Sequence, residues 1–334
     1  MGNGLGIQHR VSFARATSLP AARPYFTANT PVQPPQFTGE KQVNTLKESS
    51  FDMYQVLMGS VLYRLSPVKA LKLWVESRFL FNPQPQVSLS QFPQIQSPKL
   101  STPVSEVTFP TADGETLHGW YLPAKPGKAT VLFSNGRSGT LEKVVPYIQA
   151  LEKQGLGLLA YEYRGYGQST GLPSEGGFYH DVRAASDFLI REKNVPVSSQ
   201  VAHGWSIGGG VTTQIATERP FKAVILEATF TQMAEAVEVR RKLLGIPSWF
   251  FRMGPRQMRR FMSIEKMPQI QSPVLFLHGT RDPICPSGFS KQLLSKTTAA
   301  KSKQLILFPD ETHDLDPAKV YPAITKFIAN LPDN

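Results

Sequence analysis

From residue 104 onward, short apolar runs alternate with longer segments whose apolar residues recur every three to four positions. Runs of the first kind predict β-strands and segments of the second kind predict α-helices. The predicted strands are 107–110, 117–122, 129–134, 156–163, 201–205, 223–228, 273–278 and 304–308. The predicted helices are 141–154, 177–192, 208–218, 287–296 and 317–328. Because nearly continuous apolar strands alternate with helices, the pattern predicts an α/β fold with a mostly parallel sheet and helices on both faces.

Three other regions depart from this alternation. Residues 1–40 are rich in proline and polar residues without periodicity, which predicts a disordered tail. Residues 41–103 predict a helical extension that is broken at Ser66-Pro67, followed from residue 81 by a Pro-, Gln- and Ser-rich linker. Residues 230–270 separate two predicted strands, and they predict a small cap inserted into a domain that spans 104–334.

Composition narrows the classes of protein and partner. Hydrophobic residues make up 41% of the 334 residues, which suits a globular protein. Cys285 is the only cysteine, so no intramolecular disulfide and no cysteine-based metal site can form, and the sequence implies neither a metal nor another cofactor. Much of the net charge of +11 comes from the acid-free tail and from residues 230–270, which hold eight basic and three acidic residues. No RNA- or DNA-binding signature accompanies them, which argues against a nucleic-acid partner.

The sequence also bears on location. No run reaches the roughly 18 consecutive apolar residues of a membrane-spanning helix, since the best candidate, residues 53–81, carries five charged residues. The start lacks the apolar stretch of a secretory signal, which favours the cytoplasm, although an acid-free tail is equally typical of a targeting or export signal. The start at Met1-Gly2 loosely matches a myristoylation signal, without the preferred Ser or Thr at the sixth position.

The chemistry-bearing motif is Gly204-Trp205-Ser206-Ile207-Gly208, which fits G-x-S-x-G between a predicted strand and a predicted helix. On such a strand–turn–helix elbow a serine adopts a strained backbone conformation that exposes its hydroxyl, and the flanking glycines let backbone pass closely. The start of the helix adds a positive dipole end where negative charge develops. The context therefore predicts Ser206 as a nucleophile, whereas a glycine-rich turn before an ordinary helix is the simpler alternative.

A serine hydroxyl needs a base held by a carboxylate, and in this type of fold the order is Ser, Asp or Glu, His. Among the six histidines, only His313, in the loop 310–314 after the last predicted strand, has both the order and the loop position of a base. Asp282 follows the strand 273–278 and is the preferred acid, although it also suits a turn-forming role. Glu227, which ends the preceding strand, is the reserve acid.

Three further motifs accompany the elbow, Asp282 and His313: LHGWYLP at 117–123, VLFSNGR at 131–137 and YRGYGQS at 163–169. With these motifs, residues 104–334 resemble the α/β-hydrolase family, and they look most like its BEM46-type and ABHD17-like serine hydrolases, a group that includes protein depalmitoylases. The resemblance implies the α/β-hydrolase fold and a Ser-Asp-His triad. It does not identify the substrate.

The same resemblance implies an oxyanion hole made by the backbone N–H groups of Arg137 and Ile207. Members of the family usually have His-Gly before the first of these residues, whereas this chain has Asn135-Gly136. A change of side chain does not remove a backbone N–H donor, so asparagine at this position is compatible with an oxyanion hole. The sequence does not determine the geometry of that hole. The cysteine cluster that anchors ABHD17-like proteins to membranes is absent, and the N-terminal helical segment has no counterpart.

These features predict a serine hydrolase that cleaves a carboxylic ester or thioester bond in a small-molecule or acylated substrate. An amidase or peptidase is a close alternative, and a non-catalytic hydrolase fold that binds or docks on a membrane is a more distant one. The insertion 230–270 holds five of the eight methionines, together with aromatic residues and arginines. It suits an adaptable apolar pocket with a basic rim that contacts an anionic membrane, or a small cap with a solvated basic face.

Overall fold

A computed structural model describes residues 81, 88–95, 100–137, 139–243, 245 and 259–331 of the chain. All of them belong to one structural unit, Val61–Asn334. The predicted tail and nearly all of the predicted helical extension lie outside the described residues. Among the helices that are described, none combines the length and the apolar character needed to cross a membrane.

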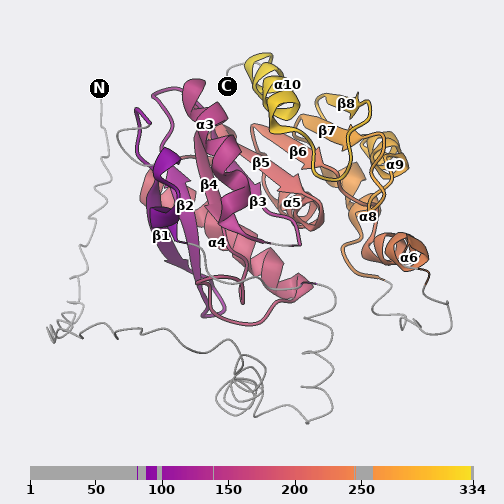
Figure 1. Cartoon of the computed structure of the whole chain (residues 1–334), viewed down its shortest axis with the longest axis horizontal. Helices are drawn as coiled ribbons and strands as arrows, with labels where there is room; N and C mark the ends of the chain where they lie inside the picture. Colours follow the sequence, from indigo (N-terminus) through magenta and orange to yellow (C-terminus); the bar gives the residue numbers. More distant parts are fainter. Residues whose placement is uncertain are drawn as a thin grey trace, which may run out of the picture. The chain divides into compact units, whose positions relative to one another are not determined.

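Eight strands form a single sheet in the order β1-β2-β4-β3-β5-β6-β7-β8, which Figure 1 shows running from the indigo to the orange part of the chain. The strands β1 and β2 are antiparallel to each other, and β2 is antiparallel to β4, whereas all the other neighbours are parallel. The strands are β1 (Ser105–Pro110), β2 (Thr116–Leu122), β3 (Thr130–Ser134), β4 (Gly157–Tyr161), β5 (Gln200–Trp205), β6 (Ala223–Glu227), β7 (Val274–Gly279) and β8 (Lys303–Phe308).

Helices cover both faces of the sheet, and each face has its own apolar core. Side chains alternate along each strand, so Leu132 on β3 packs into one core while its neighbours Val131 and Phe133 pack into the other. The core that includes Leu132 is covered by α4 (Glu175–Lys193), α5 (Ile207–Glu218) and α9 (Gly288–Lys296). The opposite core is covered by α3 (Val145–Lys153) and α10 (Pro317–Ala329). The predicted α/β fold, with a mostly parallel sheet and helices on both faces, is therefore confirmed.

Local sequence explains where the helices begin and end. The α4 helix starts after Ser174, whose hydroxyl accepts a hydrogen bond from the N–H of Gly177, and it ends at Asn194 in the left-handed conformation. The α10 helix starts after Asp316 with proline at its first position. The shorter helices are η2 (Leu89–Gln91), η3 (Pro93–Ile95), η4 (Leu141–Val144), η5 (Val197–Ser199) and η6 (Met267–Gln269). Two of them, η2 and η3, lie in the predicted linker, where Ile95 and Leu100 are buried against the sheet rather than exposed.

The insertion between β6 and β7 contains α6 (Met233–Leu243) and α8 (Ser263–Lys266). Met233, Phe261 and Met267 are buried in the same core as α4 and α5. Ion pairs join Arg241 to Glu238 at 2.6 Å and Arg259 to Glu265 at 3.2 Å. The described part of the insertion therefore packs onto the domain, and two of its arginines contact carboxylates. The aromatic residues at 249–251, which the sequence pattern assigns to an apolar pocket, lie outside the described residues.

Candidate active site

Ser206 lies at the sharp turn between β5 and α5, with backbone angles φ 55° and ψ −117°. A positive φ is strained for any residue with a side chain, so the turn requires support from its surroundings. The carbonyl of Glu227 accepts the Ser206 N–H at 2.9 Å, and the Thr229 hydroxyl donates to the Ser206 carbonyl at 2.7 Å. Both backbone polar groups of the strained residue are therefore fixed, one by the last residue of β6 and the other by Thr229, which follows the strand.

The glycine at position 208 is required by close backbone contact. A Cβ atom there would lie 1.9 Å from the carbonyl oxygen of Ser134, because the first turn of α5 packs directly on the end of β3. A Cβ atom at Gly204 would lie 2.2 Å from the Gly208 carbonyl oxygen. The G-x-S-x-G spacing thus reflects the packing of the elbow against the neighbouring strand.

The structure brings Ser206, His313 and Asp282 together from three separate segments. His313 Nδ1 lies 2.8 Å from Asp282 Oδ2, and His313 Nε2 lies 2.9 Å from Ser206 Oγ. A carboxylate can only accept, so Nδ1 carries the proton and Nε2 is left to accept from the serine hydroxyl. The serine and the histidine each retain only 9% of their exposure, so little water competes for these hydrogen bonds.

Asp282 is held in its ionised form. Burial opposes ionisation, but hydrogen bonds from His278, His313 and the backbone of Cys285 outweigh it and hold the pKa of Asp282 well below its usual range. The N–H groups of Ile284 and Cys285 each donate to Oδ1 at 2.8 Å, which leaves Oδ2 for the histidines. Asp282 therefore combines the turn-forming role with the carboxylate position beside His313.

His278 contacts the outer side of the same carboxylate. Its Nε2 donates to the Cys285 carbonyl at 2.6 Å and lies 3.3 Å from Asp282 Oδ2, while Nδ1 lies 2.6 Å from Ser290 Oγ. The sequence predicts this histidine as packed or locally bonded inside a strand, and its contacts agree. Its proximity to Asp282 could not be read from the sequence, because it depends on how the chain turns after β7.

Glu227, the reserve acid, contacts other groups. Its carboxylate lies 2.8 Å from His203 Nε2 and accepts hydrogen bonds from the Tyr147 hydroxyl at 3.0 and 3.1 Å. Its side chain lies on the face of the sheet that α3 covers. The register partner of Glu227, Trp205, packs into the core on that same face. Asp282, rather than Glu227, is the carboxylate that bonds His313.

The loop that carries His313 is attached to the elbow by Trp205. The indole Nε1–H donates to the His313 carbonyl at 3.3 Å. Lys143 lies above the indole ring at 4.5 Å from its centroid and 3.5 Å from the Asp314 carboxylate. The sequence did not single out Trp205 or Lys143, because neither has a signal beyond its own residue type.

The two residues of the predicted oxyanion hole lie on segments that contact each other. Arg137 is in the loop after β3, and Ile207 is the first residue of α5, which packs on Ser134 and Asn135. A Cβ atom at Gly136 would lie 2.6 Å from the Trp205 ring, so the loop also packs on the elbow. Burial, followed by the charge of Arg240 in α6, lowers the pKa of Arg137.

Asn135, at the position where the resemblance implies a histidine, is buried and stabilises its own loop. Its Oδ1 accepts from the Gly136 N–H at 2.8 Å, and its Nδ2 donates to the Thr140 carbonyl at 2.7 Å.

Within the described ranges, no group of three or more His, Cys, Asp or Glu side chains is arranged to hold a metal ion.

Comparison with known proteins agrees with this architecture. The chain is 30% identical over 241 residues to the alpha/beta hydrolase domain-containing protein WAV2 of Arabidopsis thaliana, covering 67% of this chain and 77% of that protein. It is 32% identical over 229 residues to an uncharacterized protein of Mycobacterium tuberculosis, covering 67% and 78% of the two chains. The chain therefore belongs to the α/β-hydrolase superfamily.

Other similarities are more distant. Residues 172–331 match the prolyl oligopeptidase family. The fold is similar to that of the Pyrococcus furiosus esterase Pf2001, with a TM-score of 0.60 at 20% identity over 75% of this chain and 97% of that one. An alpha-beta hydrolase from Vibrio vulnificus gives a TM-score of 0.61 at 19% identity over 79% and 94% of the two chains.

Proposed function

We propose that the protein is a serine hydrolase that cleaves carboxylic ester or thioester bonds. The observation that carries the proposal is the unbroken series of hydrogen bonds from Ser206 Oγ through the His313 ring to Asp282. The positive φ of Ser206 costs backbone strain that packing alone does not require. The same turn directs the serine hydroxyl out of the elbow, as a nucleophile needs. The motif resemblance further favours a BEM46-type or ABHD17-like subtype.

The reaction follows from the proton positions. His313 Nε2 takes the hydroxyl proton while Ser206 Oγ attacks the acyl carbon, and the N–H groups of Arg137 and Ile207 stabilise the resulting oxyanion. The protonated ring then donates to the departing alcohol or thiol, which leaves an acyl-serine. Water then loses a proton to Nε2 and attacks the acyl carbon of this ester, and the ring returns the proton to Ser206 Oγ as the carboxylic acid leaves. Asp282 stabilises the imidazolium in both halves.

Labelling with a fluorophosphonate probe tests the nucleophile directly. The wild-type protein should be labelled at Ser206 and should hydrolyse a short p-nitrophenyl ester, whereas Ser206→Ala should do neither while remaining folded. Ser295→Ala, which changes an exposed serine of α9, is the matched control and should behave like wild type. Failure of folded wild-type protein to label would favour the non-catalytic binding module.

A peptidase or amidase is the second candidate, because residues 172–331 match the prolyl oligopeptidase family. The same triad can cleave either bond, so the site does not decide between them. One acyl group presented as a p-nitrophenyl ester and as a p-nitroanilide separates the two. A protein whose kcat/KM for peptide anilides equals or exceeds that for esters would be a peptidase.

A further inference from the structure

The loop of the predicted oxyanion hole is held by a tyrosine from a different segment. Tyr163, two residues beyond the end of β4, donates its hydroxyl proton to the Asn135 carbonyl at 2.9 Å. Both residues are almost completely buried, with exposures of 0% and 1%. A buried hydrogen bond of this kind is protected from water, and removing its donor leaves a buried carbonyl without that partner.

The neighbouring peptide groups of this loop are also bonded. The Gly136 N–H is held by the Asn135 side chain, and the Gly136 carbonyl accepts from the Gly139 N–H at 3.0 Å. The Tyr166 hydroxyl donates to the Arg137 carbonyl at 3.3 Å and also to the carbonyl of Phe81. The peptide group that carries the Arg137 N–H therefore lies between carbonyls that two tyrosines hold in place.

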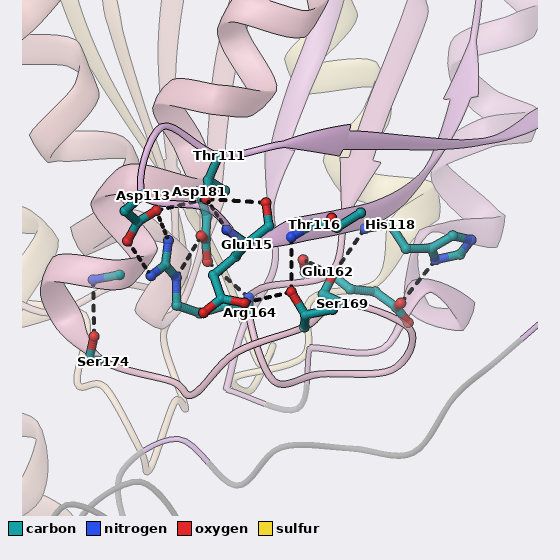
Figure 2. Close-up of polar contacts among 12 residues, drawn as sticks. Thr111, Asp113, Glu115, Thr116, His118, Glu162, Arg164, Ser169, Ser174 and Asp181 are labelled. Atoms are coloured by element: carbon teal, nitrogen blue, oxygen red, sulfur yellow. Dashed lines mark hydrogen bonds and ion pairs between the residues drawn. The ribbon is translucent and has the colours of Figure 1, made fainter. Parts of the chain in front are cut away.

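Tyr163 itself is on a rigid support. Its ring stacks on Phe178 of α4, with centroids 4.1 Å apart and an angle of 18° between the planes. The next residue, Arg164, donates from its backbone N–H and its Nε to Asp181, and from its two terminal nitrogens to Asp113, as Figure 2 shows. These contacts join the segment to α4 and to the β1–β2 turn, so the Tyr163 hydroxyl cannot easily follow a displaced loop.

We propose that Tyr163 is a positioning residue that holds the Asn135–Arg137 loop so that the Arg137 N–H is aimed at the oxyanion. This inference rests on the proposed serine-hydrolase function. Stabilisation of an oxyanion requires donors that are in place before the charge develops, and complete loss of one donor costs about 10²- to 10³-fold in rate. Loosening a donor without removing it should cost less, about tenfold.

The test is Tyr163→Phe, which removes the hydroxyl and keeps the ring stack. Its kcat on a short p-nitrophenyl ester should fall about tenfold while KM changes less than twofold, because the negative charge on the oxygen develops during attack and is absent from the bound substrate. A boronic acid that forms a tetrahedral adduct with the serine should bind about tenfold more weakly, and the carboxylic acid product should bind as it does to wild type. Rates are expressed per site titrated by the fluorophosphonate probe, so unfolded protein does not count.

Tyr161→Phe is the matched control. Tyr161 is equally buried and lies two residues earlier, but its hydroxyl contacts the Ser134 side chain at 2.9 Å rather than the loop backbone. The Tyr161→Phe variant should lose as much unfolding free energy as Tyr163→Phe does, but its kcat should equal that of wild type. Tyr166→Phe, which releases the Arg137 carbonyl, is a second probe and should lower kcat in the same sense.

The outcomes separate the two hypotheses. Loss of kcat in Tyr163→Phe but not in Tyr161→Phe, with parallel loss of boronate affinity, supports the positioning role. Wild-type kcat in a variant that still labels, or equal losses in both variants, overturns that role and leaves the serine hydrolase intact. A wild-type protein that neither labels nor hydrolyses esters overturns both. If Tyr163→Phe fails to fold, unchanged kcat and boronate affinity in Tyr166→Phe overturn the role.

Discussion

Replacing Asp282 with asparagine should test the site most sharply, because the surroundings dictate how the amide must lie. Oδ1 of Asp282 accepts the N–H groups of both Ile284 and Cys285. An asparagine keeps these two bonds only if its carbonyl oxygen takes that position, which turns its NH₂ group toward His313 Nδ1. In the opposite orientation the NH₂ group, itself a donor, would face the N–H groups of Ile284 and Cys285. Both N–H groups would then lack an acceptor, at a cost of about 1–3 kcal/mol for each of them.

The expected loss of activity follows from the tautomer of His313. With an NH₂ group beside it, Nδ1 must accept, so the ring proton moves to Nε2, which can then no longer take the proton of Ser206. In a hydrolase triad this change lowers kcat by about 10⁴-fold, or about 5 kcal/mol in the activation barrier. Folding should survive, because the substitution preserves shape and both backbone hydrogen bonds.

The assay is the hydrolysis of a p-nitrophenyl ester, with rates expressed per titrated site. Asp314→Asn is the control, since this side chain lies one residue from His313, is 72% exposed and pairs with Lys143 instead of the ring. It should retain activity within about twofold, because surface ion pairs contribute little. A loss of less than tenfold in Asp282→Asn would refute the reasoning, and a larger loss in Glu227→Gln would show that the reserve acid serves His313.

The remaining predictions concern the base, acid stability and the insertion. His313→Ala should lower esterase activity as far as Ser206→Ala does, because triad members act as a unit; retained activity would mean that another residue is the base. Asp282 has a lowered pKa in the folded state, so its stabilisation is present above the unfolded value of about 4 and is lost as pH falls through the folded value. The unfolding free energy of wild type should therefore approach that of Asp282→Asn below pH 4 in denaturant titrations. The protein should also co-sediment more with anionic than with neutral vesicles. Replacing Arg256, Arg259 and Arg260 of the insertion with glutamine should reduce this binding without abolishing ester turnover. Equal sedimentation of wild type with both kinds of vesicle would remove the membrane hypothesis.

Much of the fold could be predicted from the sequence because its signals are local. A strand shows as an apolar run and a helix as a repeat of three to four residues, so the predicted elements agree with the observed ones to within a few residues. The elbow was equally visible, since Gly204 and Gly208 mark the close backbone packing that places Ser206 between strand and helix. His313 could be chosen by order and loop position.

Contacts between distant residues required the tertiary structure. Glu227 ends β6 and Asp282 follows the neighbouring parallel strand β7. Only the strand register and the turn after β7 direct Asp282 toward His313 and Glu227 toward His203. Trp205 contacts the His313 carbonyl across 108 residues of sequence, and Tyr163 contacts the Asn135 carbonyl across 28. Such pairs leave no periodic trace, because each side chain fits its own segment equally well without the other. The sheet order and the packing of the helices bring them within hydrogen-bond distance, and so the supports of the site are properties of the folded chain alone.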